Sequence, residues 1–411
     1  MTAYYDELET RDPEAREAAL LAALPDAIAH AKANAPGFAQ ILAAVASGDV
    51  ASRAALAALP VTRKSDLIEL QQAEPPFGGL TATQPRDMAR LFMSPGPIAD
   101  PEGRGQDWWR FARALFAAGF RKRDIVHNCF SYHFTPAGSM FETAAHALGC
   151  AVVAGGTGQT EMQVQAIAHF AADGFAGTPD FLKIVLDKAK EMGTKLPTLT
   201  KACVSGGALF PSLRDEIRAH GVNVLQCYGS ADLGLIAYES EAMEGMIIDE
   251  NLIVEILRPG TGDPVPGGEV GEVVVTTLNR DYPLLRFATG DLSALLPGIS
   301  PCGRTAPRIK GWMGRADQTT KVRGMFVHPA QIDRVVKRHP EVLRARLVVD
   351  SKDGKDAATI VCESAADHDS LGVQVQQSVQ AECKLRATVR IVAPNTIPND
   401  GKVIEDIRSY A

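Results

Sequence analysis

The sequence has few cysteines, no excess of positive charge and no long apolar run. Its seven cysteines are odd in number and scattered over 411 residues, which excludes a disulfide framework. The net charge of −7 argues against nucleic acid as the main partner, because binding phosphodiesters requires a basic face. No apolar run is long enough to cross a membrane, and the first residues lack the basic start and apolar core of a secretory signal. We therefore expect a cytoplasmic protein with no membrane partner.

What the sequence does contain is typical of a globular protein with two domains or one divided large domain. Segments typical of strands and helices alternate in its middle part, which predicts an α/β fold with a mostly parallel sheet. The expected strands are Asp124–Phe130, Ala151–Val153, Gly174–Ala176, Lys201–Val204 and Val222–Gln226. The expected helices are Asp12–Asn34, Trp109–Ala118, Ala137–Leu148, Thr160–Asp173 and Pro179–Met192.

The later part of the chain has a different pattern. Asn251–Leu257 and Gly271–Leu278 are expected to form antiparallel strands with a long connection rich in proline and glycine. After Gly324 we expect a small α+β unit, with helices at Pro329–Arg338 and Asp367–Cys383.

Asp291 is the first candidate site residue. It ends a glycine turn, Thr289-Gly290-Asp291, that follows a strand. A carboxylate in such a place can accept two hydrogen bonds from a ribose diol. Arg315 follows in a second segment punctuated by glycines. The alternative is that this region is a solvated connection between two domains.

Glycines after two other expected strands predict a place for a flat base. One strand leads into Ser205-Gly206-Gly207-Ala208, where the backbone can approach a ligand closely. The next leads into Tyr228-Gly229-Ser230-Ala231-Asp232, which offers the ring of Tyr228 for stacking. Asp232 could hold a magnesium ion through a carboxylate oxygen.

Two further segments have weaker signals. Phe92–Ile98 contains a constrained turn that could present backbone amides to a phosphate, although two prolines remove two of the donors. Lys402 follows an Asn-Asp-Gly turn and is expected to be exposed, which fits either a movable functional group or an ordinary surface lysine.

Motifs along nearly the whole chain resemble the phenylacetate–coenzyme A ligase branch of the adenylate-forming superfamily, which also contains acyl-CoA synthetases, adenylation domains and luciferases. The segments that carry the resemblance are LPVTRKSDL, SGGALFPSLRDEI, CYGSADLG, YPLLRFATGDL, PCGRTAPRIKGWMGRAD and TIPNDGK. The resemblance implies a large domain, residues 1–318, and a small mobile C-terminal domain, residues 319–411.

The resemblance also implies a reaction in two steps, in which a carboxylic acid and ATP form an acyl-adenylate and coenzyme A then displaces AMP. Residues Ser205–Ala208 would line the adenine and Tyr228 would stack on it, with Gly229 and Ser230 also at the nucleotide. Asp291 would bind the ribose hydroxyls with Arg315 nearby, and Asp232 would hold magnesium. Lys402 would be the catalytic lysine of the first step.

The sequence departs from the family pattern at four places. The phosphate loop of the family resembles SSGTTGKP, whereas Ser94–Pro101 reads SPGPIADP. Ala231 and Asp232 stand where a hydroxyl residue and a glutamate are usual, and Gln318 stands at the hinge position. Many relatives have a zinc site, but here Ser240 and Ser300 occupy ligand positions near Cys302. One thiolate does not make a structural zinc site, so we expect no zinc.

The acid is not identified by the sequence. Aromatic residues follow one strand where the family places its acyl pocket, which favours an aromatic or medium-sized apolar acid, but the same residues could form core. They are Phe130, Tyr132, His133, Phe134 and Phe141. The resemblance suggests a homodimer.

Three functions remain open at this point. The protein could be an active acyl-CoA ligase with a divergent phosphate loop, an adenylating enzyme with another acceptor, or a binding protein without catalysis. Retention of Asp291, Arg315 and Lys402 favours catalysis, whereas the altered loop favours the third.

Overall fold

The computed structural model describes residues 3–94, 98–316, 318, 320–322, 325–352, 355–365 and 369–408. Its contacts divide the chain into two compact units. Unit 1 comprises Met1–Val254, Val274–Thr289 and Leu295–Trp312, and unit 2 comprises Glu255–Val273, Gly290–Ala294 and Met313–Ala411. The chain passes from one unit to the other five times, within the strands β11 (Leu252–Leu257), β12 (Gly271–Thr277) and β13 (Phe287–Ser293) and again after Ala294 and after Trp312.

Unit 1 is built on a nine-stranded sheet of order β14-β15-β10-β9-β8-β7-β6-β4-β5. Strands β5, β4, β6, β7 and β8 are parallel to one another. The neighbouring pairs from β8 to β14 are antiparallel. The α/β prediction is confirmed. The strands are β4 (Ile125–Asn128), β5 (Ala151–Ala154), β6 (Gly174–Gly177), β7 (Lys201–Val204), β8 (Asn223–Ser230), β9 (Gly234–Tyr238), β10 (Met246–Ile248), β14 (Leu295–Leu296) and β15 (Arg308–Ile309).

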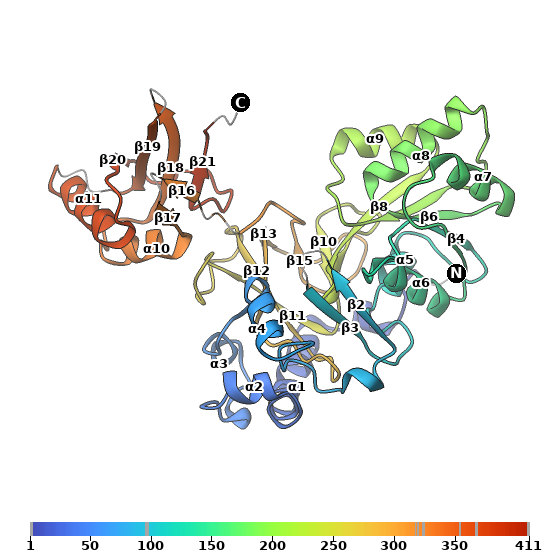
Figure 1. The fold of residues 1–411 in the computed structure, drawn as a ribbon, viewed down its shortest axis with the longest axis horizontal. Coiled ribbons are helices and arrows are strands. Elements are labelled where there is room, and N and C mark those ends of the chain that lie inside the picture. Colours follow the sequence, from blue (N-terminus) through green and yellow to red (C-terminus); the bar gives the residue numbers. More distant parts are fainter. Residues whose placement is uncertain are drawn as a thin grey trace. The chain divides into compact units, whose positions relative to one another are not determined.

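Helices cover both faces of the parallel part of this sheet (Figure 1). Helices α7 (Thr160–Phe170), α8 (Pro179–Glu191) and α9 (Pro211–Ala219) share one core with it, and α5 (Ala112–Ala117) and α6 (Ala137–Leu148) share the other. Consecutive residues of β7 show why two cores form. Ala202 packs with the first group of helices and Cys203 with the second, because successive side chains of a strand point to opposite faces.

Local signals in the sequence fix where these helices begin. Thr178 accepts a hydrogen bond from the Phe181 amide at 3.3 Å, and Pro179 stands in the first turn of α8. Asp12 does the same for α1 (Pro13–Asn34), accepting from the Ala15 amide at 2.9 Å. A side-chain cap satisfies an amide that has no partner inside the helix, and proline tolerates the first turn because it has no amide hydrogen to satisfy.

The remaining elements of unit 1 come early in the chain. They are the 3₁₀ helices Glu7–Thr10, Ser47–Asp49, Lys64–Asp66 and Pro85–Asp87, the helices α2 (Pro36–Ile41), α3 (Arg53–Ala57) and α4 (Leu67–Ala73), and the strands β1 (Thr62–Arg63), β2 (Arg90–Ser94) and β3 (Ile98–Glu102). β2 and β3 form an antiparallel hairpin. β1 is parallel to the start of β13, with Thr62 opposite Phe287.

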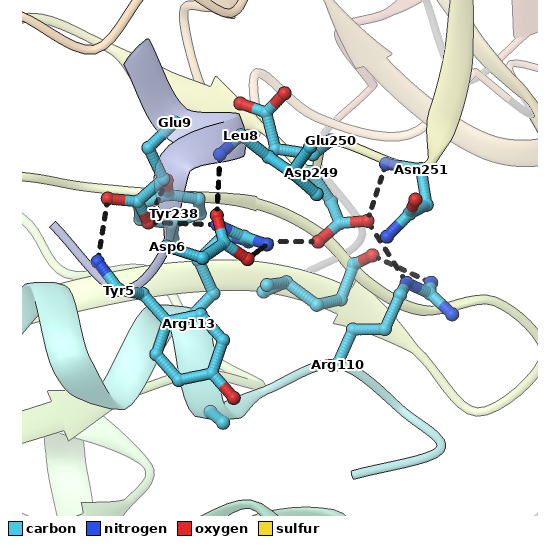
Figure 2. A network of polar contacts seen from close by, with 12 residues as sticks. Tyr5, Asp6, Leu8, Glu9, Arg110, Arg113, Tyr238, Asp249, Glu250 and Asn251 are labelled. Atoms are coloured by element: carbon cyan, nitrogen blue, oxygen red, sulfur yellow. Dashed lines mark hydrogen bonds and ion pairs between the residues drawn. The ribbon is translucent and has the colours of Figure 1, made fainter. Parts of the chain in front are cut away.

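A buried network of charges holds the N-terminal segment against the sheet of unit 1 (Figure 2). The fully buried Glu9 carboxylate accepts hydrogen bonds from Arg113 Nη1 at 3.2 Å, Arg304 Nε at 2.9 Å and the Tyr238 hydroxyl at 3.1 Å. Beside it, Glu250 accepts from Arg16 Nε at 2.6 Å. Buried charges of this kind are tolerated only when they are paired and hydrogen-bonded.

Unit 2 contains a second sheet, of order β20-β19-β18-β21, with a core shared by two helices. Its elements are β16 (Thr320–Val322), β17 (Met325–Val327), α10 (Pro329–Lys337), β18 (Arg344–Lys352), β19 (Lys355–Glu363), α11 (Asp369–Cys383), β20 (Thr388–Val392) and β21 (Ile404–Asp406). The apolar stripe of α10 supplies Ile332 and Val335 to this core. Among the described residues of both units, no helix is long and apolar enough to span a membrane.

Candidate active site

The expected base-binding residues lie side by side in unit 1. Val204 ends β7 opposite Gln226 of β8, so the segment Ser205–Ala208 leaves the sheet next to Tyr228. The Ser205 hydroxyl donates to the Cys227 carbonyl at 2.8 Å, which fixes the start of that segment. Gly206 and Gly207 are exposed, and Gly206 has a φ of +72° that favours glycine. An open stretch of backbone therefore stands beside a half-buried aromatic ring.

Strand β8 is longer than expected. The sequence predicts an end at Gln226, but β8 continues through Tyr228, Gly229 and Ser230 because its second half pairs with β9 in the antiparallel direction. The pairing shifts register between Tyr228 and Gly229. The Tyr228 hydroxyl donates to Thr289 Oγ1 at 3.2 Å, which orients the ring.

Asp232, the expected magnesium ligand, is buried rather than open to solvent. Its Oδ2 atom lies 2.6 Å from Lys64 Nζ, and the carboxylate side chain has no exposed area. Its Oδ1 atom has no hydrogen-bond partner among the described residues. One oxygen is thus held by a cation of the protein, and the other retains its capacity to bind a metal.

Asp291 lies inside β13, so the predicted glycine turn Thr289-Gly290-Asp291 is wrong. The segment is part of a strand because residues 313–316 pair with it, although Gly290 itself has a left-handed backbone conformation. The Ala316 amide donates to the Gly290 carbonyl at 2.7 Å, and Arg315 Nη1 donates to Asp291 Oδ1 at 2.7 Å. Gly290 is needed here, because its φ is +75° and a Cβ atom would lie 2.8 Å from Arg315 Nη2. Unit 2 therefore presents a carboxylate oriented by a half-exposed guanidinium.

Lys402 lies at the surface of unit 2, on a loop that is held in two ways. From one side, the buried Arg346 donates to the carbonyls of Pro398 and Lys402, each at 3.0 Å. From the other side, the Gln318 amide donates to the Gly401 carbonyl at 2.8 Å and accepts from the Ile404 amide at 2.9 Å. The Lys402 side chain is half-exposed, with Nζ 3.1 Å from Glu405 Oε1. A loop held by hydrogen bonds on both sides thus carries a cation that can be presented to a ligand.

Of the segment Ser94–Pro101, Ser94 belongs to β2 and Ile98–Pro101 belong to β3, whereas Pro95–Pro97 lie outside the described residues. The Ser94 hydroxyl donates to the Asp100 carboxylate. The Met93 amide donates to the carbonyl of Phe134, which lies between β4 and α6, at 2.8 Å. The Ser94 hydroxyl is therefore hydrogen-bonded to a carboxylate of its own hairpin.

The aromatic residues expected at an acyl pocket divide into two groups. Phe130 and Phe141 are buried and stacked with ring centroids 4.4 Å apart, and Phe111 packs on Phe141 at 4.8 Å. These positions favour the core alternative for Phe130 and Phe141. By contrast, His133 and Phe134 are exposed, and Phe134 has 79% of its surface accessible. Tyr132 is half-buried and its hydroxyl accepts from Asn128 Nδ2 at 2.8 Å. Tyr132, His133 and Phe134 remain candidates to contact an acid.

The residues at the expected zinc positions form a different arrangement. Cys302 Sγ lies 3.1 Å from Ser300 Oγ and accepts from Arg304 Nη1 at 3.5 Å. Burial raises the pKa of the Cys302 thiol, but hydrogen bonds from Ser240, Ser300 and Arg304 outweigh it and bring the pKa below the ordinary value. Among the described residues, no group of three or more His, Cys, Asp or Glu side chains could hold a metal.

We predict that the purified protein contains no stoichiometric zinc. A single thiolate surrounded by two hydroxyls and a guanidinium lacks the three or four nitrogen and sulfur ligands that zinc requires. Elemental analysis by inductively coupled plasma mass spectrometry measures this directly. A ratio of one zinc per chain would contradict the prediction.

Three residues that hold the candidate groups were not expected from the sequence. Lys64 precedes Asp232 by 168 residues, and Arg346 precedes Lys402 by 56 residues. Gln318 was noted only as an unusual residue at a hinge. The only sequence signal for a role of Lys64 is its place in the motif LPVTRKSDL, and that motif does not show which carboxylate the lysine pairs with.

Two family models match the chain. The model of the AMP-binding enzyme matches residues 106–279, and the model of the AMP-binding enzyme C-terminal domain matches residues 324–407. The chain is 30% identical to phenylacetate-coenzyme A ligase of Aromatoleum evansii over 90% of its own length and 88% of that protein. It is also 30% identical to phenylacetate-coenzyme A ligase of Thermus thermophilus, over 84% of this chain and 81% of that one.

Solved structures agree with these matches. A 2-hydroxyisobutyryl-CoA ligase in the postadenylation state matches with a TM-score of 0.73 and 26% identity, covering 100% of this chain and 93% of that one. The same ligase in complex with its acyl-AMP and CoA matches with a TM-score of 0.72 and 25% identity, covering 99% and 93%.

Proposed function

This chain belongs to the AMP-binding enzyme family, and we therefore propose that it activates a small carboxylic acid with ATP and transfers the acyl group to coenzyme A. The observation that carries the proposal is the edge formed by β7 and β8. There the exposed backbone of Gly206 and Gly207 lies beside the ring of Tyr228. Carboxyl ends of parallel strands are the usual place for a nucleotide in such sheets.

The reaction that follows from the proposal has two balanced steps. In the first, a carboxylate oxygen attacks the α-phosphorus of ATP, the bond to the β-phosphate oxygen breaks, and pyrophosphate leaves. In the second, the sulfur of coenzyme A attacks the acyl carbon, the bond to the AMP oxygen breaks, and the thiol proton passes to solvent. The protein must hold both partners in line and neutralise negative charge on their oxygens.

We assign the residues as follows. Ser205–Ala208 and Tyr228 hold the adenine, and Asp291 accepts hydrogen bonds from the ribose hydroxyls while Arg315 orients it. Lys402 neutralises the carboxylate and α-phosphate oxygens in the first step. Asp232 fits a magnesium ion, because a buried carboxylate oxygen without a partner among the described residues is the kind of ligand that magnesium takes. When bound, magnesium would neutralise charge on the phosphate oxygens.

The acid is proposed to be aryl or another small carboxylic acid. This rests on relatives named for phenylacetate and on the exposed Phe134 and His133 beside the half-buried Tyr132. The cytoplasm as the location and a homodimer as the assembly belong to the same proposal, and both rest on the sequence and its resemblance.

One observation favours a second candidate function. Ser94 donates its hydroxyl to Asp100, so the start of the phosphate loop faces a carboxylate. A protein that binds an acyl or nucleotide ligand without turnover would have less need of a loop that holds pyrophosphate.

Release of pyrophosphate from ATP and a panel of carboxylic acids, with and without coenzyme A, tests the proposal. A ligase of the proposed kind should release pyrophosphate with at least one acid and should sustain turnover only when coenzyme A is present. Turnover with an amine or a carrier-protein thiol, but not with coenzyme A, would identify another acceptor. A complete lack of pyrophosphate with every acid would favour the binding protein.

Asp291→Ala should weaken ATP binding by about 1.5–3 kcal/mol, the contribution of hydrogen bonds to a charged acceptor. By the usual conversion this is roughly a tenfold to 150-fold rise in Kd. Isothermal titration calorimetry measures the change. The matched control is Asp263→Ala, which removes an exposed carboxylate paired with Lys337 and should leave ATP affinity unchanged. Equal ATP affinity in wild type and Asp291→Ala would remove Asp291 from the nucleotide site.

A further inference from the structure

Backbone pairing and one ion pair place Lys64 at the proposed nucleotide site of unit 1. Strand β1 runs parallel to the start of β13, and Lys64 is the next residue after β1, so the chain leaves the strand at the level of Thr289. Thr289 Oγ1 accepts the hydroxyl of Tyr228 at 3.2 Å. Lys64 Nζ itself lies 2.6 Å from Asp232 Oδ2. Lys64 is therefore beside the residues proposed to hold the adenine and the magnesium ion.

The two members of the ion pair differ in their exposure. The side chain of Asp232 has no exposed area, whereas 30% of the Lys64 side chain is exposed. Solvent, and hence a ligand, reaches the lysine rather than the carboxylate oxygen that it holds. An ammonium group has three donors, so a lysine that donates to Asp232 can also donate to an oxygen atom of a ligand.

The segment that corresponds to the phosphate loop does not supply the charge that a triphosphate needs. Ser94–Pro101 contains neither lysine nor arginine, and the Ser94 hydroxyl donates to the Asp100 carboxylate. Lys402 and Arg315 belong to unit 2. Of the described residues that we assign to the site in unit 1, Lys64 is the one with a fixed positive charge. Phosphate oxygens are bound most strongly by charged donors, and lysine is a common one.

We propose that Lys64 binds the β- and γ-phosphate oxygens of ATP, and hence the pyrophosphate that leaves, in place of a cation in the segment Ser94–Pro101. Before the nucleotide arrives, the pair with Asp232 holds the ammonium group at the site. Lys64 and Lys402 then act on different phosphates, the first on the leaving pyrophosphate and the second on the α-phosphate. The inference rests on the proposed function, since it adds a binding residue to the same site.

Isothermal titration calorimetry of the full-length protein with ATP and with AMP, both in EDTA, tests this inference without a contribution from magnesium. Removal of Lys64 alone would leave the buried Asp232 without its cation, which is destabilising. The decisive comparison is therefore between Asp232→Asn and the double variant Lys64→Met/Asp232→Asn. Loss of Lys64 in this background should weaken ATP binding at least about tenfold and change AMP binding less than about twofold, because AMP has neither of the proposed phosphates. Lys64→Arg keeps the charge and should bind ATP within about threefold of wild type.

A second lysine–aspartate pair of unit 1 provides the matched control. Lys201 Nζ lies 2.8 Å from Asp124 Oδ2, and 20% of its side chain is exposed. Lys201 is the first residue of β7, at the opposite end of the strand from Ser205. The double variant Lys201→Met/Asp124→Asn should bind ATP like Asp124→Asn. Circular dichroism identifies any variant that fails to fold, and if the Lys64 double variant does not fold, Lys64→Gln compared with wild type decides.

Two results would overturn the inference. The first is equal ATP affinity with and without Lys64 in a folded protein. The second is a loss of the same factor for ATP and AMP, as expected if Lys64 only supports the adenine site through Asp232. Wild type that binds AMP but not ATP would also overturn it. Wild type that binds neither nucleotide, with or without magnesium, would instead overturn the proposed function.

Discussion

Replacing Lys402 with alanine is expected to slow formation of the acyl-adenylate by about two to three orders of magnitude, the scale typical for loss of one electrostatic stabiliser of a transition state. The side chain is half-exposed and its Nζ atom lies 3.1 Å from the partly exposed Glu405, so its removal leaves no buried charge without a partner. The fold and the binding of ATP should change far less. In the proposed mechanism Lys402 acts only in the first step, and preformed acyl-adenylate should still be converted to the thioester at close to the normal rate.

Two assays separate the steps. Pyrophosphate release follows the first, and mass spectrometry of the thioester made from synthetic phenylacetyl-adenylate, or the adenylate of another active acid, follows the second. The matched control is Lys337→Ala, another exposed lysine of unit 2 with acidic partners, Asp263 and Asp333. It should leave both steps intact. A parallel loss of both steps in a folded Lys402→Ala protein would show that Lys402 has no role specific to one step, and no loss in either would make it a surface lysine.

Replacing Glu9 with alanine is expected to lower the free energy of unfolding by about 3–5 kcal/mol, the range for breaking a buried ion pair from one side. Glu9 is fully buried and accepts from Arg113 and Tyr238 (Figure 2) as well as from Arg304. Its loss leaves Arg304, which is buried, without its carboxylate partner. The effect arises from the arginines that remain rather than from the carboxylate that is removed.

Urea unfolding followed by tryptophan fluorescence measures this change. Glu7→Ala is the matched control, because Glu7 lies in the same 3₁₀ turn and is exposed. It should stay within about 0.5 kcal/mol of wild type, as is usual for surface substitutions. If Glu9→Ala also stays within that range, the network does not stabilise the fold.

The sequence predicted the layered part of the fold well because its signals are local. The helix expected at Ala137–Leu148 and the strand expected at Lys201–Val204 have the predicted bounds. Alternating strands and helices also fixed the parallel arrangement, and with it the edge where Ser205–Ala208 and Tyr228 lie together. Such predictions depend on periodicity and on caps, which each segment carries within itself.

What could not be predicted depends on partners far away in the chain. Thr289-Gly290-Asp291 contains residues typical of turns, yet it belongs to a strand, with a left-handed conformation at Gly290 alone, because residues 313–316 pair with it. The place of Lys64 beside Asp232 has the same cause. Periodicity also does not distinguish an aromatic residue of a pocket from one of the core, and Phe141 belongs to the core.

Transfer of a labelled oxygen tests the central claim, formation of an acyl-adenylate followed by a thioester, most directly. The protein is incubated with ATP, magnesium, coenzyme A and a carboxylic acid that carries ¹⁸O in both carboxylate positions, and the products are analysed by mass spectrometry. Because a carboxylate oxygen attacks the α-phosphorus and stays on it when the thioester forms, AMP should carry one ¹⁸O atom and the acyl-CoA the other. Unlabelled AMP, or formation of ADP in its place, would contradict the account.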